Sequence, residues 1–246
     1  MKISPKQLCG HRGVAADAPE NTLASIRQVR LWEMEWVEID VQLTQDGVPV
    51  VFHDDTLSRC TNGVGRLGET PYAQLAQLDA GGYFDTNYQG ERVPTLAAVL
   101  AQVAADELHI NIEIKTYPET DIPRLCDAVA ATLSETGFPL ERVLLSSFSL
   151  EALAYCQTAM PSVARAILWD VVPEDWHRYQ DLATYSIHCH YRGITELQAK
   201  AIKACGLKIK CYTPNHPEEV AHLWEWGVDM MITDAPSNYL GSAPTE

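Results

Sequence analysis

The sequence predicts a (β/α)8 TIM barrel with a small insertion after the second strand. Short runs rich in β-branched and aromatic residues alternate with amphipathic segments of helical period, and the alternation continues through eight strands. The length of 246 residues suits one such barrel, and an apolar fraction of 46% is enough for a large core. An open doubly wound sheet is the alternative, but no GxGxxG motif follows the first strand.

Strands and helices are expected in turn along residues 1–246, which we interpret as one domain. The strands are expected at residues 7–10, 36–41, 109–115, 142–147, 165–169, 186–189, 207–212 and 229–233. The helices are expected at residues 23–32, 96–105, 122–135, 150–159, 174–183, 196–204 and 217–226. Asn21 or Thr22 is a good N-cap for the first helix.

One segment, at about residues 55–93, breaks the alternation. It is rich in Gly, Asp, Thr and Asn, holds one short helical candidate at 72–78, and is too long for an ordinary loop. An Asp-Gly turn precedes it, and Pro49 cannot donate to a β-ladder, so the strand at 48–52 is expected at an edge. We therefore expect a small insertion over the carboxyl ends of the barrel strands.

The composition excludes several classes of partner. Acidic residues outnumber basic ones by 33 to 18, and the basic residues do not cluster, which argues against nucleic acid and against stable membrane association. An anionic substrate would therefore need a local positive site. The seven cysteines form no CxxC pair, the N-terminus has no apolar signal region, and no run of about 18 apolar residues occurs. These features predict a cytoplasmic protein with reduced thiols.

Two predicted strands bring carboxylates to one face. Glu38 and Asp40 alternate with β-branched residues on the second strand, and Asn111, Glu113 and Lys115 alternate with three isoleucines on the third. Polar residues at the carboxyl ends of barrel strands face the active site. Three converging carboxylates suit one hard divalent cation, Mg²⁺ or Ca²⁺, with Mn²⁺ or Co²⁺ as further candidates. The alternative is a solvated or salt-bridged acidic strand.

Two histidines and two cationic residues are expected at the same rim. His11 and His53 are candidate proton carriers, because imidazole titrates near neutral pH, although either could be a structural hydrogen-bonding group. Arg12 and Lys115 can neutralise a phosphate beside the metal or serve as counter-ions for the carboxylates. Further pocket-lining positions are expected at Asn111, His188 and His190. We favour pocket lining over a transition-metal site for the last two, because no third soft ligand has a defined spacing.

Short motifs along nearly the whole chain, from about residue 8 to 237, resemble those of the glycerophosphodiester phosphodiesterases. The resemblance looks closest to the cytoplasmic bacterial members that serve glycerol-3-phosphate uptake. The motifs are HRG at 11–13, PENT at 19–22, EIDVQLTQDGVPVVFHD at 38–54, NIEIK at 111–115, LLSSF at 144–148 and GVDMMITDAP at 227–236.

The resemblance implies a reaction and a role for each matching residue. The reaction is hydrolysis of glycerophosphodiesters, such as glycerophosphocholine or glycerophosphoethanolamine, to sn-glycerol 3-phosphate and an alcohol, with a divalent cation. Carried over by motif, the roles are metal binding by Glu38, Asp40 and Glu113, acid/base catalysis by His11 and His53, and phosphate binding by Arg12 and Lys115.

The chain departs from many members of that family on the seventh strand. It has Cys-Tyr-Thr-Pro-Asn at 211–215 where Trp-Thr-Val-Asn is usual, so Tyr212 is expected in a changed aromatic wall of the pocket. The alternatives are a lysophospholipase D-like or cyclising phospholipase on the same barrel, or a non-catalytic phosphodiester-binding protein. The sequence leaves open the preferred alcohol, the native metal, the oligomeric state, which histidine is the acid, and whether water or the substrate 2-hydroxyl is the nucleophile.

Overall fold

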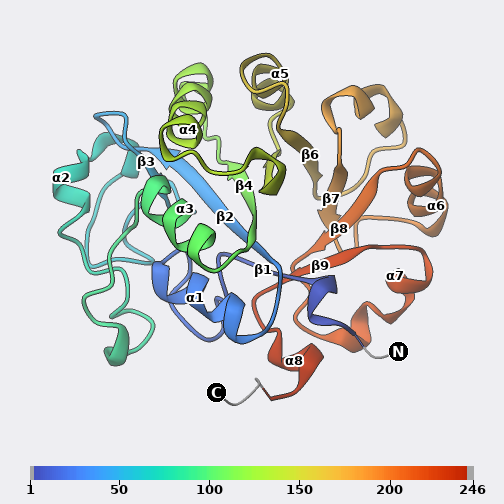
Figure 1. Ribbon diagram of the computed structural model, residues 1–246, viewed down its shortest axis with the longest axis horizontal. Helices are drawn as coiled ribbons and strands as arrows, with labels where there is room; N and C mark the ends of the chain where they lie inside the picture. The colour runs from blue at the N-terminus through green and yellow to red at the C-terminus, as the bar shows by residue number, and fades with distance from the viewer. Residues whose placement is uncertain (1–2, 243–246) are drawn as a thin grey trace.

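Eight parallel strands close into a barrel in the computed structural model, which describes residues 3–242. β1 pairs with both β2 and β9, so the first and last strands leave no open edge between them. Figure 1 shows β1 lying beside β9, which confirms the predicted (β/α)8 barrel. The barrel strands are β1 (Leu8–Gly10), β2 (Trp36–Leu43), β4 (His109–Ile114), β5 (Val143–Ser147), β6 (Ala164–Trp169), β7 (Ser186–His190), β8 (Lys208–Tyr212) and β9 (Met230–Thr233).

Helices pack around the outside of the strands, and most begin at a side-chain cap (Figure 1). Thr22, Thr95, Asp121, Ser149 and Thr195 each accept a hydrogen bond from the backbone N–H three residues later. Within residues 3–242, no helix is both long and apolar enough to span a membrane. The helices outside the insertion are α1 (Leu23–Leu31), α3 (Leu96–Ala105), α4 (Ile122–Thr136), α5 (Leu150–Ala159), α6 (Glu196–Ala204), α7 (Ala221–Glu225) and α8 (Ser237–Leu240).

Two of the predicted helices are wrong in form. The segment expected as a helix over 174–183 is a 3₁₀-helix, Trp176–Leu182, in a stretch whose Trp, His, Tyr and Asp residues have modest helix propensity. The helix expected over 217–226 is divided into a 3₁₀ turn at Pro217–Glu219 and the short α7. Val220 lies between the two pieces and is completely buried, with φ −121° and ψ 8°. Burial of Val220 in the core stabilises this conformation more than continuation of the helix would.

The two faces of β2 and β4 have different chemistry, as predicted. On β2 the residues facing the helices, Val37, Ile39 and Val41, are fully buried in the main apolar core. The alternate residues point into the barrel, and in the register with β4, Glu38 lies opposite Asn111 and Asp40 opposite Glu113. The period-2 alternation therefore puts polar groups from neighbouring strands at the same height inside the barrel.

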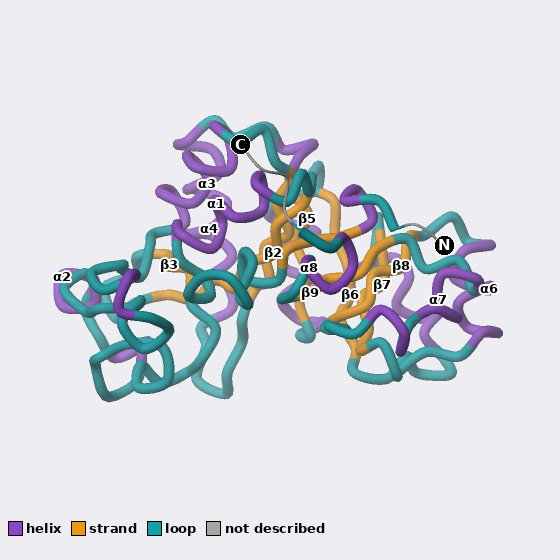
Figure 2. The backbone as a smooth tube through the Cα atoms, turned by 90° about the horizontal axis from the view of Figure 1, so that it is seen from below, coloured by secondary structure: helices purple, strands orange, loops and turns teal. Residues whose placement is uncertain are grey.

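The segment after β2 has a hydrophobic cluster of its own. It begins with β3 (Pro49–Val51), which pairs antiparallel with the end of β2, and contains α2 (Tyr72–Leu75), shorter than the helix expected at 72–78. Figure 2 shows β3 and α2 to one side of the barrel strands. His53 lies two residues after the end of β3, so this hairpin carries it towards the barrel rim. The cluster is formed by Val50, Phe52, Leu57, Cys60, Leu67, Leu75, Ala80 and Val93.

Candidate active site

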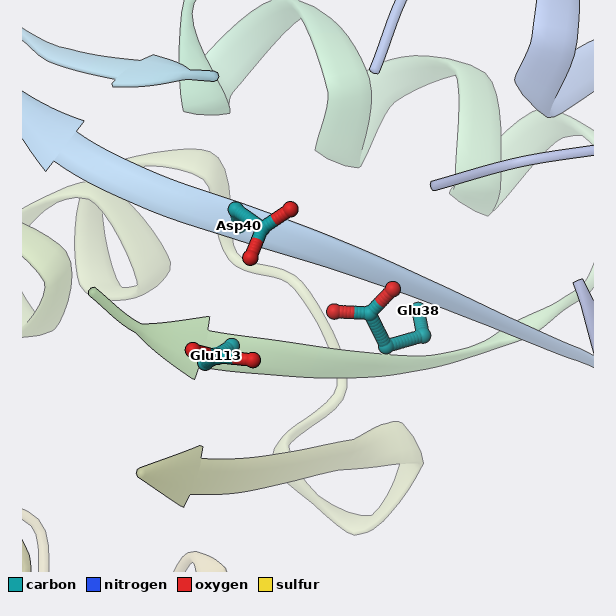
Figure 3. Close-up of side chains that lie close together, drawn as sticks. All are labelled: Glu38, Asp40 and Glu113. Carbon is teal, nitrogen blue, oxygen red and sulfur yellow. The ribbon is translucent and has the colours of Figure 1, made fainter. Parts of the chain in front are cut away.

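Three buried carboxylates meet at the carboxyl end of the barrel. Glu38 and Asp40 come from β2 and Glu113 from the neighbouring β4, and each offers an oxygen within 4.8 Å of those of the other two. Figure 3 shows the three side chains extending from the two strands towards a common space. Their exposed fractions are only 4%, 1% and 7%, so solvent screens their mutual repulsion poorly.

The electrostatics of this cluster favour added positive charge. Burial, followed by repulsion from Asp40, raises the pKa of Glu38 well above its usual value and that of Glu113 to about 7. Burial also opposes ionisation of Asp40, but Lys115 and Arg12 outweigh it and hold the pKa of that carboxyl well below its usual range. A bound cation would relieve the strain on the two glutamates, and an all-carboxylate donor set fits a hard divalent ion.

Arg12 and Lys115 border the carboxylates and only partly neutralise them. Lys115 Nζ lies 2.8 Å from Glu113 Oε1 and 3.3 Å from Asp40 Oδ1, while Arg12 Nε lies 3.4 Å from Asp40 Oδ2. With all three carboxylates ionised, three negative charges face two positive ones. A bound divalent cation would change this excess of one negative charge into an excess of one positive charge, which favours an anionic phosphodiester.

The turn after β1 fixes Arg12 against the cluster. Arg12 and Gly13 have φ values of 53° and 84°, and the turn lets the Arg12 N–H donate to Glu38 Oε2 at 3.0 Å. A Cβ at position 13 would meet Ser25 Oγ at 2.3 Å, so only glycine allows α1 to approach this closely. Thr22, not Asn21, caps α1, which leaves the Asn21 amide free to donate to Asp40 Oδ2 at 2.9 Å.

Each of the two predicted histidines is paired with a carboxylate through Nδ1. His11 Nδ1 lies 2.6 Å from Asp234 Oδ1, and His53 Nδ1 lies 2.7 Å from Asp54 Oδ1. With Nδ1 engaged, Nε2 is the nitrogen left on each ring, and both rings line the same cavity. Burial lowers the pKa of His53, and the nearby Asp40 carboxylate partly offsets that effect.

The cavity between these groups has a volume of about 150 Å³. Of the further pocket residues predicted, Asn111, His188 and Tyr212 line it, whereas His190 does not. The His190 ring instead packs edge-on against Tyr212, with centroids 6.1 Å apart. The lining is completed by His11, Arg12, Glu38, His53, Glu113, Lys115, Phe148, Leu168, Thr213 and Ile232.

Sequence reasoning missed the groups that hold His53. Gln42 Nε2 donates to the carbonyl oxygens of Phe52, His53 and Asp54, and the Tyr117 hydroxyl donates to that of His53 at 2.5 Å. These contacts fix a histidine that no barrel strand carries. Gln42 follows Asp40 by two residues on β2 and so shares its face. This alternation could have identified Gln42 as a site residue from the sequence.

Asp54, Asp234 and Arg59 were also missed as site residues. Asp54 is adjacent to His53 in the sequence, and Asp234 directly follows β9, the strand that pairs with β1. Arg59 binds both Asp54 and Glu20, at 2.6 Å each, and Glu20 in turn binds Arg12 at 2.7 Å. This chain of ion pairs connects the insertion to the turn after β1.

Comparisons with known proteins agree with the fold and with the motifs. A family model described as "Glycerophosphoryl diester phosphodiesterase family" matches residues 11–238. A glycerophosphodiester phosphodiesterase of Caldanaerobacter subterraneus is 32% identical, over 94% of this chain and 94% of that protein.

Solved structures also resemble the barrel. A phosphodiesterase of Oleispira antarctica, solved in complex with the product sn-glycerol-3-phosphate, superposes with a TM-score of 0.90 at 35% identity and covers 95% of this chain and 94% of its own. A glycerophosphodiester phosphodiesterase from Agrobacterium tumefaciens has a TM-score of 0.79 at 27% identity, over 96% and 100% of the two chains. The chain therefore belongs to the glycerophosphoryl diester phosphodiesterase family and is an enzyme of that class.

Proposed function

We propose that the chain hydrolyses glycerophosphodiesters, such as glycerophosphocholine or glycerophosphoethanolamine, to sn-glycerol 3-phosphate and an alcohol, with the help of one divalent cation. The observation that carries the proposal is a cluster of three buried carboxylates beside one cavity, which is also lined by two cationic side chains and two carboxylate-paired histidines. The related Oleispira antarctica structure, which holds sn-glycerol-3-phosphate, supports this class of product.

Glu38, Asp40 and Glu113 would hold the cation. When bound, such an ion supplies positive charge that attracts the phosphate oxygens and offsets charge that develops on them during the reaction. Mg²⁺ or Ca²⁺ fits a set of carboxylate oxygens best, and Mn²⁺ or Co²⁺ can bind the same donors. Arg12 and Lys115, which already border the cluster, would bind the remaining non-bridging oxygens.

His11 and His53 would divide the proton transfers. We assign His53 as the general acid that protonates the departing alkoxide, a poor leaving group without a proton, and His11 as the general base. Asp54 and Asp234 would orient the two rings through their Nδ1 atoms. The base can activate either water or the glycerol 2-hydroxyl of the substrate, and the second route passes through a cyclic phosphate.

Release of sn-glycerol 3-phosphate from glycerophosphocholine tests the proposal. We expect activity with added Mg²⁺ or Ca²⁺, abolition by a chelator, and recovery on metal addition. His11→Ala and His53→Ala should each lose about 10²–10⁴-fold in kcat, whereas the exposed His177→Ala should match the wild type. Full turnover in either active-site variant would refute the histidine assignments, and full activity in chelator would refute metal dependence.

A lysophospholipase D-like activity is the second candidate. Val64, Tyr83 and Phe84 on the insertion are exposed by 81%, 42% and 37%, and such side chains can contact an acyl chain. Turnover of lysophosphatidylcholine faster than that of glycerophosphocholine would favour this second activity.

A location in the cytoplasm also remains a prediction, which fractionation of expressing cells would test.

A further inference from the structure

Two buried thiols face each other across a pair of neighbouring helices, away from the active site. Cys126 lies on α4 and Cys156 on α5, and their sulfur atoms are 3.6 Å apart. The helices pack side by side on the outside of the barrel (Figure 1). A disulfide needs an S–S distance of about 2.05 Å, so side-chain rotation with a small approach of the helices would bring the sulfurs into bonding distance.

Among the residues that the structure describes, no carboxylate pairs with a buried guanidinium that acts on Cys156. Arg165 on β6 is 3% exposed, its Nη1 donates to the Val163 carbonyl at 3.1 Å, and its Nε has no hydrogen-bond partner. Within residues 3–242, Cys156 is the one acidic group found to act on its charge. Because a buried cation is costly without a negative partner, this environment favours a thiolate on Cys156.

The two thiols are not equivalent. The hydrogen bond between the sulfurs lowers the pKa of Cys156, burial opposes this, and Arg165 lowers that pKa further. The same hydrogen bond raises the pKa of Cys126, with burial acting in the same direction. Cys156 is thus the better nucleophile, and Cys126 is the neutral thiol beside it.

A groove lies on the protein surface near the pair, although neither thiol lines it. It has a volume of about 380 Å³ and is lined by Ala130, Ala159 and Val163, among others. Ala130 lies one turn beyond Cys126 on α4, Ala159 lies about one turn beyond Cys156 on α5, and Val163 carries the carbonyl that binds Arg165. A small oxidant such as a peroxide in this groove would therefore lie about one helical turn from the two buried thiols.

We propose that Cys126 and Cys156 form a reversible disulfide in response to hydrogen peroxide. The Cys156 thiolate attacks one peroxide oxygen and the O–O bond breaks, giving a sulfenic acid and a hydroxide that takes up a proton to become water. The Cys126 sulfur then attacks the sulfenic sulfur, the S–O bond breaks, and the departing hydroxide leaves as water with the Cys126 proton. Two thiols and one peroxide thus yield one disulfide and two waters, and a dithiol reductant reverses the change.

A second cysteine pair serves as an internal comparison. Cys189 and Cys211 have sulfurs 3.8 Å apart, but they lie in register on the hydrogen-bonded strands β7 and β8. The hydrogen bond to Cys189 and then burial raise the pKa of Cys211, with no cationic group opposing them. If the distance between the sulfurs alone decided oxidation, both pairs would form disulfides. The mechanism proposed here predicts a disulfide only between Cys126 and Cys156.

Peptide mapping of the full chain distinguishes these outcomes. Trypsin would release Cys126 in peptide 125–142, Cys156 in 143–165, Cys189 in 179–192 and Cys211 in 211–246. After peroxide treatment and alkylation of free thiols, we expect peptide 125–142 joined to 143–165, separation by a dithiol, and a thermal midpoint about 5 °C higher for the oxidised form. The link should be absent in Cys126→Ser and Cys156→Ser.

Arg165→Gln tests the role of the guanidinium. Loss of its charge should slow disulfide formation several-fold, because the pKa of the Cys156 thiol rises and its thiolate fraction falls. Circular dichroism would verify that the variant is folded, and Cys189→Ser is the matched control that should oxidise like the wild type. The proposal fails if both thiols stay reduced at a peroxide dose that oxidises the exposed Cys205, or if peptides 179–192 and 211–246 are joined instead.

Discussion

Asp54→Asn tests how His53 is made competent for proton transfer. Asp54 Oδ1 lies 2.7 Å from His53 Nδ1, and this hydrogen bond raises the pKa of His53 against the effect of burial. Asparagine keeps the shape of the side chain but removes its negative charge. The imidazolium form of His53, which the proposed acid role requires, therefore becomes harder to populate.

The size of the effect follows from the kind of contact that is lost. A hydrogen bond to a charged group contributes about 1.5–3 kcal/mol, equivalent to roughly 10- to 150-fold in rate. A Coulomb estimate for unit charges about 4 Å apart gives about 4 kcal/mol at an effective dielectric of 20 and about 1 kcal/mol in water. Because the Asp54 side chain is 24% exposed, the true value lies between these limits. We expect a loss of about 10²-fold in kcat/KM.

The assay is release of sn-glycerol 3-phosphate from glycerophosphocholine across a range of pH. In the variant, the alkaline limb of the pH–rate profile should move to lower pH, because the pKa of His53 falls further. Asp55→Asn is the matched control, since this neighbouring carboxylate pairs with Arg66 at 3.3 Å and not with a histidine. Activity of Asp54→Asn within twofold of the wild type, or an equal loss in Asp55→Asn, would show that the Asp54 carboxylate does not support proton transfer by His53.

Three other substitutions have defined outcomes. Glu113→Gln should weaken divalent-cation affinity by about 10²-fold or more, which Mn²⁺ binding followed by electron paramagnetic resonance would measure. Lys115→Met should raise the KM for glycerophosphocholine about tenfold or more in steady-state kinetics, because a phosphate-binding charge is lost. Lys210→Met should raise the thermal midpoint at pH 7 by a few degrees, because burial lowers the pKa of Lys210 from 10.5 to about 8 and its protonated form costs about 3 kcal/mol. The last gain should shrink between pH 8 and 10.5, where the folded wild type has already released that proton; a constant gain would contradict this account.

The strict alternation in β2 and β4 explains why the centre of the site could be predicted. Each side chain in a strand has only two faces to choose between, so Glu38, Asp40 and Glu113 were assigned to one face without knowledge of any contact. Parallel pairing of the two strands then brought the three carboxylates together.

Contacts between segments distant in the sequence could not be predicted in the same way. Asp234 reaches His11 because the barrel closes between β9 and β1, and Arg59 reaches Glu20 only because the insertion folds back over the turn after β1. The division of the helix expected at 217–226 likewise depends on burial of Val220 in the tertiary core. Local sequence patterns carry no information about these contacts, because the contacts depend on the tertiary fold.

Calorimetric titration of the metal-stripped protein with Ca²⁺, Mg²⁺ or Mn²⁺ would show whether Glu38, Asp40 and Glu113 together bind one divalent cation. We expect one ion per chain in the wild type, and no binding in Asp40→Asn, because this carboxylate of the cluster no longer carries charge. Absence of binding at millimolar concentrations of all three ions, or unchanged binding in Asp40→Asn, would rule out a metal site at these residues.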